Sequence, residues 1–375
     1  MMSAHDDLES RPLHELPARV VDQARELAGD GLIALYLTDV DGACLLRLAG
    51  DEALPPRLGA AGAVGPELDL AAVDAIRERL RERWPQATVA PLWVLGRALG
   101  VLITTEPPVG PLAALAEVAA PLFELAAGFT DVFERGRRRK QPSAAAEVQL
   151  ELLPPRIARV AAGSIAASVL PAYDVGGDWF DHADNEEGVW LAIGDAMGKG
   201  IRAAAISAVS IGALRSARRA GADVRDCARE MHRAIYELGS HGFVTAVIGF
   251  WDLRQSTFTW SNCGHLPPLL TRDGTTRELL TDATYPLGLL EHDRQFSAAT
   301  IEVRSGDRLL LYSDGIVEAR LPDATRFGLE QFQETVRATA GLDPPAAVAR
   351  IERDVLEATG GEIRDDATQL LLAID

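Results

Sequence analysis

The pattern of hydrophobic and polar residues changes near residue 155. Beyond this point short apolar runs alternate with turns, and two long Ala-rich segments with helical spacing interrupt them. Such a pattern predicts an α+β domain over residues 156–375, with sheets inside and helices outside. The expected strands lie at 243–252, 256–264, 267–274, 299–303, 307–314 and 368–374, and the expected helices at 200–221, 223–239, 328–340 and 344–359.

The first part of the chain predicts a smaller mixed α/β domain over residues 13–130, preceded by a flexible tail at 1–12. Asp41-Gly42 lies between two apolar runs, which is a strong signal for a β-hairpin. Gly29 ends the first helical pattern. The expected elements are a helix at 13–31, a hairpin at 32–50, a helix at 68–84 and a hairpin at 89–106.

A long helical stretch is expected from 112 to about 153, and its part at 131–155 is interpreted as a helical linker. Gly136 and Pro142 weaken the helical pattern. The linker's apolar stripe is compatible with a homodimeric coiled coil, although it contains few heptads. A basic cluster is interpreted as a solvated face, with a docking site for an acidic surface as the alternative. It consists of Arg135, Arg137, Arg138, Arg139 and Lys140.

Composition excludes several classes of partner. The 375 residues include 37 Lys and Arg against 55 Asp and Glu, a net charge of −18 that repels nucleic acid and anionic lipid. The apolar stretch 111–129 contains Glu117, Pro121 and Glu124 and falls short of a membrane span. The three cysteines lack the paired spacing of disulfides or zinc sites. The N-terminus has no export signal, so we expect a cytoplasmic protein.

Four aspartates, each interpreted as lying at the end of a strongly apolar run and so at the end of a buried strand, are the main candidates for chemistry: Asp178, Asp195, Asp314 and Asp365. A single aspartate in such a place is usually a turn or a helix cap. Four in matching contexts favour a shared acidic pocket, and clustered carboxylates favour a bound divalent cation. Because no His or Cys stands at ligand spacing, Mg²⁺ or Mn²⁺ is expected instead of Zn²⁺.

The motifs favour metal-assisted hydrolysis. Two divalent ions can bind a phosphoryl group and activate water for in-line attack. The sequence has no G-x-S-x-G elbow and no plausible Cys–His pair for covalent catalysis. GDAMGKG (194–200) is not a P-loop, because three residues instead of four separate its first two motif glycines and Gly200 replaces the Ser or Thr.

A series of motifs carries a family resemblance: LELLPPR, YDVGGDWFD, GDAMGKG, FVTAVIGFWD, NCGHLPPLL, YPLGL, GDRLLLYSDGIVEAR, FGLE and DDAT. In order and spacing, residues 147–375 resemble the metal-dependent protein phosphatases (PPM, type 2C), specifically their SpoIIE-like and RsbU-like bacterial branch. The resemblance implies a protein serine/threonine phosphatase with an αββα sandwich and two Mn²⁺ or Mg²⁺ ions.

The resemblance also implies roles for individual residues. Asp195 and Asp178 would be catalytic, with Asp195 bridging both metals and Asp178 holding one of them. The Ala196 carbonyl would be a further ligand. Asp314 and Asp365 would hold the other ion, with Asp366 as the second choice for Asp365.

One residue departs from the family pattern: Met197 stands where eukaryotic members carry a histidine acid, so that proton must come from water or elsewhere. For two other polar residues a structural role is weighed against a functional one. His265 is interpreted as a structural hydrogen-bonding group. Lys199 either attracts phosphate or simply begins the following helix.

The family implies a phosphorylated STAS-type anti-sigma factor antagonist as the substrate, in a partner-switching pathway. The N-terminal domain resembles a GAF-like sensor, most clearly at residues 90–106, with a PAS-like sensor as the alternative; it would gate the phosphatase through the 112–153 helix. Two other functions stay open: a catalytically silent partner-binding module, and a phosphatase of a small phosphorylated metabolite. Retention of all four aspartates argues against the silent module.

Overall fold

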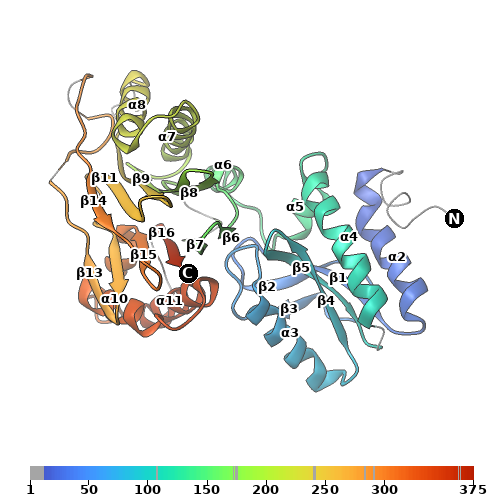
Figure 1. Ribbon diagram of the computed structural model, residues 1–375. Coiled ribbons are helices and arrows are strands. Elements are labelled where there is room, and N and C mark those ends of the chain that lie inside the picture. Colours follow the sequence, from blue (N-terminus) through green and yellow to red (C-terminus); the bar gives the residue numbers. More distant parts are fainter. Residues whose placement is uncertain are drawn as a thin grey trace. The chain divides into compact units, whose positions relative to one another are not determined.

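The computed structural model divides the chain into two compact units, residues 1–141 and 142–375 (Figure 1). Each unit has its own sheets and its own hydrophobic core. The structure describes residues 12–106, 109–171, 173, 176–239, 242–282, 284–289, 292–361, 363 and 365–375. The expected tail at 1–12 lies outside the described residues except for Pro12.

The first unit is built on one antiparallel five-stranded sheet with the order β3-β2-β1-β5-β4. Both hairpins expected from the sequence are confirmed, as the β1–β2 and β4–β5 pairs. Gly29 ends the first long helix with a φ of 68°, which glycine adopts without strain. The elements are η1 (Leu13–Glu15), α2 (Leu16–Ala28), β1 (Ile33–Thr38), β2 (Cys44–Gly50), β3 (Arg57–Gly59), α3 (Leu70–Arg83), β4 (Thr88–Val94), β5 (Arg97–Thr104), α4 (Val109–Ala127) and α5 (Val132–Gly136).

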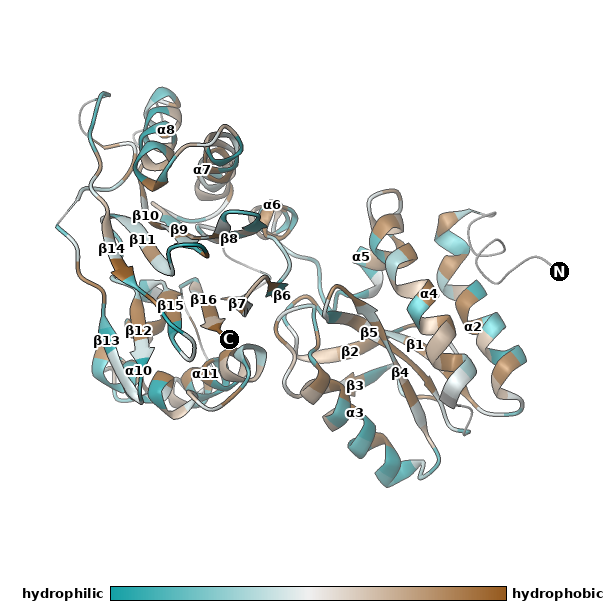
Figure 2. Ribbon diagram, in the orientation of Figure 1, coloured by the Kyte–Doolittle hydropathy of each residue, from teal (hydrophilic) through white to brown (hydrophobic). Residues whose placement is uncertain are grey.

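Helices cover both faces of this sheet. On one face α2 and α4 share an apolar cluster with the strands, and on the other α3 packs against a second cluster. Figure 2 shows hydrophilic residues along α3 and hydrophobic ones along β4. Among the described residues, Gly110–Ala127 of α4 is the one segment long and apolar enough to cross a membrane. Leu112, Ala119 and Phe123 of this segment are buried in the unit's core, so the membrane signal is weak.

The expectation of one long helix over 112–153 is wrong. The segment breaks into α4, the short α5 and α6 (Ala144–Leu152). One break spans residues 128–131, and the second falls between Gly136 and Ser143, where Gly136 packs against Leu48 and Pro142 lacks an amide hydrogen. Ser143 then begins α6 by accepting a hydrogen bond from the Ala146 amide.

The basic cluster is not simply a solvated face. Arg139 pairs with the buried Asp39 and with Asp41, which lie in and beside the β1–β2 turn. Arg138 pairs with Glu134, and the side chain of Arg138 is only 16% exposed. The solvated interpretation is therefore wrong for Arg138, whereas Arg139 stays exposed while it pairs with acidic groups of the same unit. Arg135 and Lys140 are exposed.

The second unit has four layers, helices–sheet–sheet–helices, as expected from the sequence. Its antiparallel sheets have the orders β14-β11-β10-β9-β8 and β13-β12-β15-β16-β7-β6. The strands are β6 (Ile157–Val160), β7 (Gly163–Leu170), β8 (Asp178–Asn185), β9 (Gly188–Ala196), β10 (Val244–Asp252), β11 (Thr257–Cys263), β12 (Leu269–Arg272), β13 (Thr275–Glu278), β14 (Ala299–Glu302), β15 (Arg308–Tyr312) and β16 (Ala367–Ile374).

The inner faces of these sheets share one apolar core, to which Phe180, Val247, Leu309 and Leu370 belong. Helices α7 (Ile201–Arg219) and α8 (Val224–Glu237) cover the outer face of the first sheet. Helices α10 (Leu329–Ala338) and α11 (Pro344–Ala358) cover the second, with the short α9 (Asp314–Val317) at its edge. All four helices expected in this part of the chain are confirmed.

Candidate functional site

The aspartates singled out in the sequence meet at one edge of the two sheets. Asp178, the first residue of β8, lies directly opposite Asp195 near the end of β9. Asp314 follows β15 as the first residue of α9, and Asp365 lies just before β16, the strand paired with β15. The expectation that all four acids lie at strand ends is therefore wrong for Asp178, which starts β8, and for Asp365, which lies before the start of β16. The four acids still converge, because the start of one antiparallel strand lies beside the end of the next.

A tight turn holds the first of these acids in place. Asp366 accepts hydrogen bonds from the backbone amides of Gly177 and Asp178 at 2.9 and 3.1 Å. Gly177 in turn accepts, at its carbonyl, a 2.6 Å bond from the Ser207 hydroxyl on α7. Gln149 of α6 donates its side-chain amide to the Asp178 carbonyl at 2.6 Å. Three separate segments therefore fix the backbone at Gly177 and Asp178.

Burial and mutual repulsion disfavour the charged forms of these carboxyls. Burial, and then the charges of Asp314, Asp366 and Asp365, raise the pKa of Asp195 to about 7. The pKa of the fully buried Asp178 is raised well above its usual value by burial, then by Asp195 and Asp366. Burial also raises the pKa of Asp366, to about 6, and the pKa of Asp314 is raised chiefly by burial.

The donors fit a hard divalent cation. Oδ2 of Asp178 and Oδ1 of Asp366 are buried without a hydrogen-bond partner. A side chain at Gly177 would put its Cβ 3.2 Å from Oδ1 of Asp195 and 3.0 Å from the Ala196 carbonyl oxygen, so glycine keeps this space open. All these donors are oxygens, which Mg²⁺ and Mn²⁺ prefer. Within the described ranges, no three His, Cys, Asp or Glu side chains are already grouped as a metal cage.

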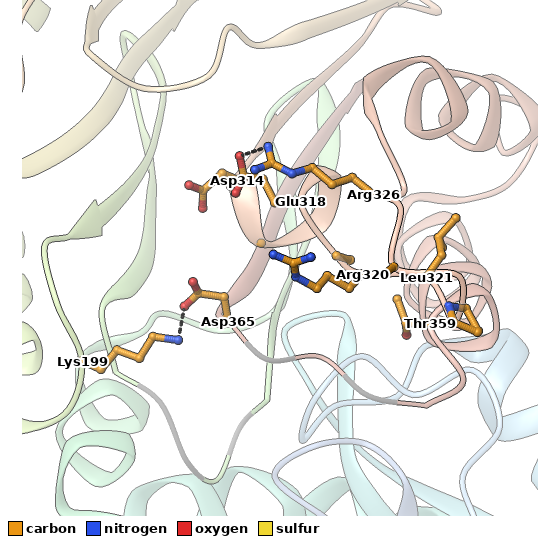
Figure 3. A pocket seen from close by; sticks show the side chains of 12 residues that line it. Lys199, Asp314, Glu318, Arg320, Leu321, Arg326, Thr359 and Asp365 are labelled. Atoms are coloured by element: carbon orange, nitrogen blue, oxygen red, sulfur yellow. Dashed lines mark hydrogen bonds and ion pairs between the residues drawn. The ribbon is translucent and has the colours of Figure 1, made fainter.

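The two neighbouring acids of the DDAT motif lie in different environments. Asp366 is 4% exposed and faces the Gly177-Asp178 turn. The side chain of Asp365 is 61% exposed and forms a 2.8 Å ion pair with Lys199 (Figure 3). Lys199 lies before α7 and does not begin it; instead it neutralises the charge of an acid at the rim of the site.

Gln149 and Ser207 were not among the residues expected in the site. Both are buried polar residues within Ala-rich helical segments. Their polarity on otherwise apolar faces is the only signal that the sequence offers, and it does not say what they contact. The structure shows that both bind the backbone of the Gly177-Asp178 turn.

His265 is structural, as expected. Its ring lies between the Thr245 hydroxyl at 2.7 Å and the Tyr312 carbonyl at 3.1 Å, so Nε2 donates and Nδ1 accepts. Thr245 belongs to one sheet and Tyr312 to the other, and the histidine joins them. Burial lowers its pKa to about 4, which keeps the ring neutral. Met197 is 45% exposed.

A pocket of about 480 Å³ opens beside Asp314 and Asp365, the rim acids of the site (Figure 3). Three cations and three anions contribute to its wall, together with apolar residues of the segment after α9. The charged residues are Lys199, Arg320, Arg326, Asp314, Glu318 and Asp365, and the others are Gly315, Ala319, Leu321, Pro322, Ala324 and Thr359.

The fold of the second unit is shared with a solved structure. The SiaA-PP2C domain of Pseudomonas aeruginosa superposes with a TM-score of 0.50 at 20% sequence identity, covering 56% of this chain and 85% of that one. This likeness defines the class of fold to which the second unit belongs, that of the PP2C domains.

The chain belongs to the SpoIIE family: the model of Stage II sporulation protein E matches residues 185–375, about half of its length. The phosphoserine phosphatase RsbU of Bacillus subtilis is 25% identical over 233 residues, which cover 61% of this chain and 68% of RsbU. The phosphoserine phosphatase RsbP of the same organism is 26% identical over 151 residues, covering 39% of this chain and 37% of RsbP.

Proposed function

We propose that this chain hydrolyses phosphoserine or phosphothreonine on a STAS-type anti-sigma factor antagonist in a partner-switching pathway of the cytoplasm. The convergence of the four aspartates on one edge of the sheets is the observation that carries the proposal. The names of RsbU and RsbP, both phosphoserine phosphatases, support the type of phosphoryl group.

Two divalent ions, Mn²⁺ or Mg²⁺, would occupy the acidic centre. Asp195 would bridge them, with the Ala196 carbonyl as a further ligand and Asp178 on one ion. Asp314 and Asp365 would hold the other ion, and Asp365 would have to break its ion pair with Lys199 to bind it. The bound ions would neutralise the phosphoryl oxygens and activate the attacking water.

The chain's own residues would orient this centre. Asp366 is the second choice as a ligand: its Oδ2 accepts from two backbone amides, which supports a positioning role, while its buried Oδ1 stays available to a cation. Met197 offers no proton, so the leaving group would take its proton from solvent. The raised pKa values of the buried acids support the need for cations, since bound metal would relieve the repulsion that raises them.

The first unit would act as the regulatory domain, with a GAF-like fold over residues 13–130 and a PAS-like fold as the alternative. Helix α6, in the linker at 131–155, supports a gating role because Gln149 contacts Asp178 directly. Homodimerisation through this linker stays a prediction.

The decisive experiment is Mn²⁺-dependent release of phosphate from a phosphorylated STAS-type antagonist, repeated with Asp195→Asn. The wild-type protein should release phosphate only with the metal, and the variant should not. Release that depends on neither would contradict the mechanism. Failure to bind divalent ions at millimolar concentration in calorimetry would favour a silent binding module, and hydrolysis of small phosphate esters alone would favour a metabolite phosphatase.

A further inference from the structure

The pocket beside the rim acids has a preformed wall. After α9, residues 320–326 form a narrow hairpin in which Arg320 and Arg326 pair across the two arms. The Leu321 amide donates to the Thr325 carbonyl at 2.9 Å, and Asp323 accepts bonds from the amide and hydroxyl of Thr325. These bonds fix the backbone of the hairpin, which sets where its two arginines leave the chain.

The three cations of the pocket are not equivalent. Lys199 pairs with Asp365 at 2.8 Å, and Arg326 pairs with Glu318 at 2.6 Å. The side chain of Arg320 forms no ion pair or hydrogen bond with any residue of the described ranges. Figure 3 shows its guanidinium directed towards the side of the pocket where Asp314 and Asp365 lie.

The pocket lies next to the catalytic centre but does not include its buried core. Asp178, Asp195 and Asp366 do not contribute to its wall, whereas Ala319, Leu321, Pro322 and Ala324 do. Its 480 Å³ therefore has room for a short stretch of polypeptide flanking the phosphorylated residue. An arginine in such a place suits a carboxylate, which it can bind through two parallel hydrogen bonds.

We propose that Arg320 determines substrate specificity by binding an acidic side chain next to the phosphorylated residue of a protein substrate. The inference rests on the proposed function, and it adds a sequence preference to it: phosphorylation sites with Asp or Glu nearby are favoured over neutral ones. The preference arises when substrate binds, so it appears in KM more than in kcat.

The test compares two phosphoserine peptides that differ only in carrying Asp or Asn on both sides of the phosphoserine. The full chain with Mn²⁺ should favour the acidic peptide by about 5-fold in kcat/KM, as expected for a partly exposed ion pair. Arg320→Ala should reduce this ratio to about one, and Arg320→Glu should instead favour a lysine-flanked peptide. Arg254→Ala is the matched control, because Arg254 is an exposed arginine beyond the far end of β10.

An unchanged ratio in Arg320→Ala, or no acidic preference in the wild-type protein, would overturn the inference. The proposed function fails separately, if the wild-type protein hydrolyses neither peptide. In that case, calorimetry measures how tightly each peptide binds to the Asp195→Asn variant. This tests the role of Arg320 without requiring turnover. Tighter binding of the acidic peptide, lost in Asp195→Asn/Arg320→Ala, supports the subsite, and equal binding of the two peptides contradicts it.

Discussion

Asp366 accepts a hydrogen bond from the backbone amide of Gly177 at 2.9 Å, although 189 positions separate the two residues. The bond joins the start of β16 in one sheet to the turn before β8 in the other. The preceding residue, Asp365, instead faces solvent and pairs with Lys199. The two consecutive acids therefore have different structural roles, and substitutions at each position can distinguish these roles.

Asp365→Asn should reduce metal binding and activity without affecting folding. The side chain is exposed, so the free energy of unfolding should change by no more than about 0.5 kcal/mol. Loss of a ligand carboxylate should weaken Mn²⁺ binding by at least ~10-fold, with a matching loss of phosphate release at limiting metal. Titration calorimetry and urea unfolding measure the two effects, and unchanged Mn²⁺ affinity would remove Asp365 from the ligand set.

In contrast to Asp365, Asp366 should affect the stability of the fold. Asp366→Asn keeps an oxygen that can accept from both amides and removes a charge from a crowded acidic cluster, so stability at pH 8 should stay the same or increase. Asp366→Ala leaves two buried amides unpaired, which costs about 1–3 kcal/mol for each. Urea unfolding without metal checks both variants. Equal stability of Asp366→Ala and wild type would show that water replaces the carboxylate.

Much of the fold could be predicted because its signals are local. The hairpin around Asp41-Gly42 and the Ala-rich helix after Gly200 are encoded by residues next to one another. The convergence of the four aspartates was also expected, because each was interpreted as lying at the end of an apolar strand. Their exact order in the site was not, because Asp178 starts its strand while Asp195 lies near the end of its own.

The features that the sequence did not reveal depend on contacts between distant segments. Arg139 looks like part of a solvated basic run, yet it pairs with Asp39, 100 positions away. Gln149 looks like one polar residue in a helix, yet it binds the Asp178 carbonyl. Neither partner follows from spacing or periodicity, so one sequence alone could not identify them.

Without metal, the acidic centre should make the protein less stable as pH rises. The folded chain keeps protons on Asp195 (pKa about 7) and Asp366 (about 6) where the unfolded chain, with values near 3.8, has lost them. The free energy of unfolding contributed by these groups is therefore present below about pH 4 and lost as pH rises towards 7.

Urea unfolding in EDTA at pH 5.5 and pH 8 measures this loss, which should be on the order of 2 kcal/mol. Asp195→Asn is the control, because it keeps the chain's histidines and removes one titrating acid; its stability should fall less over the same range. Saturating Mn²⁺ should abolish the difference. An equal decline in both proteins would mean that the acids are not the cause.

Gly315 should tolerate no side chain. A Cβ at this position would lie 1.9 Å from the Asp366 carbonyl oxygen, and backbone on both sides would have to move. Gly315→Ala should therefore lower the free energy of unfolding by at least ~2 kcal/mol. Gly212→Ala in α7 is the control, since nothing lies within 4 Å of its Cβ, and it should stabilise the helix by about 0.5–1 kcal/mol. Thermal unfolding of the two variants should shift in opposite directions.

Gln149→Ala should weaken metal binding although Gln149 touches no expected ligand atom. Its 2.6 Å bond to the Asp178 carbonyl is buried, and its loss leaves that carbonyl unpaired at a cost of about 1–3 kcal/mol. With the Asp178 backbone less fixed, Mn²⁺ affinity should fall by roughly 10-fold. Glu151→Ala, on an exposed position of the same helix, should change neither property. If Gln149→Ala lowers stability but binds Mn²⁺ like wild type, α6 supports the fold without controlling the centre, and gating through this helix would be excluded.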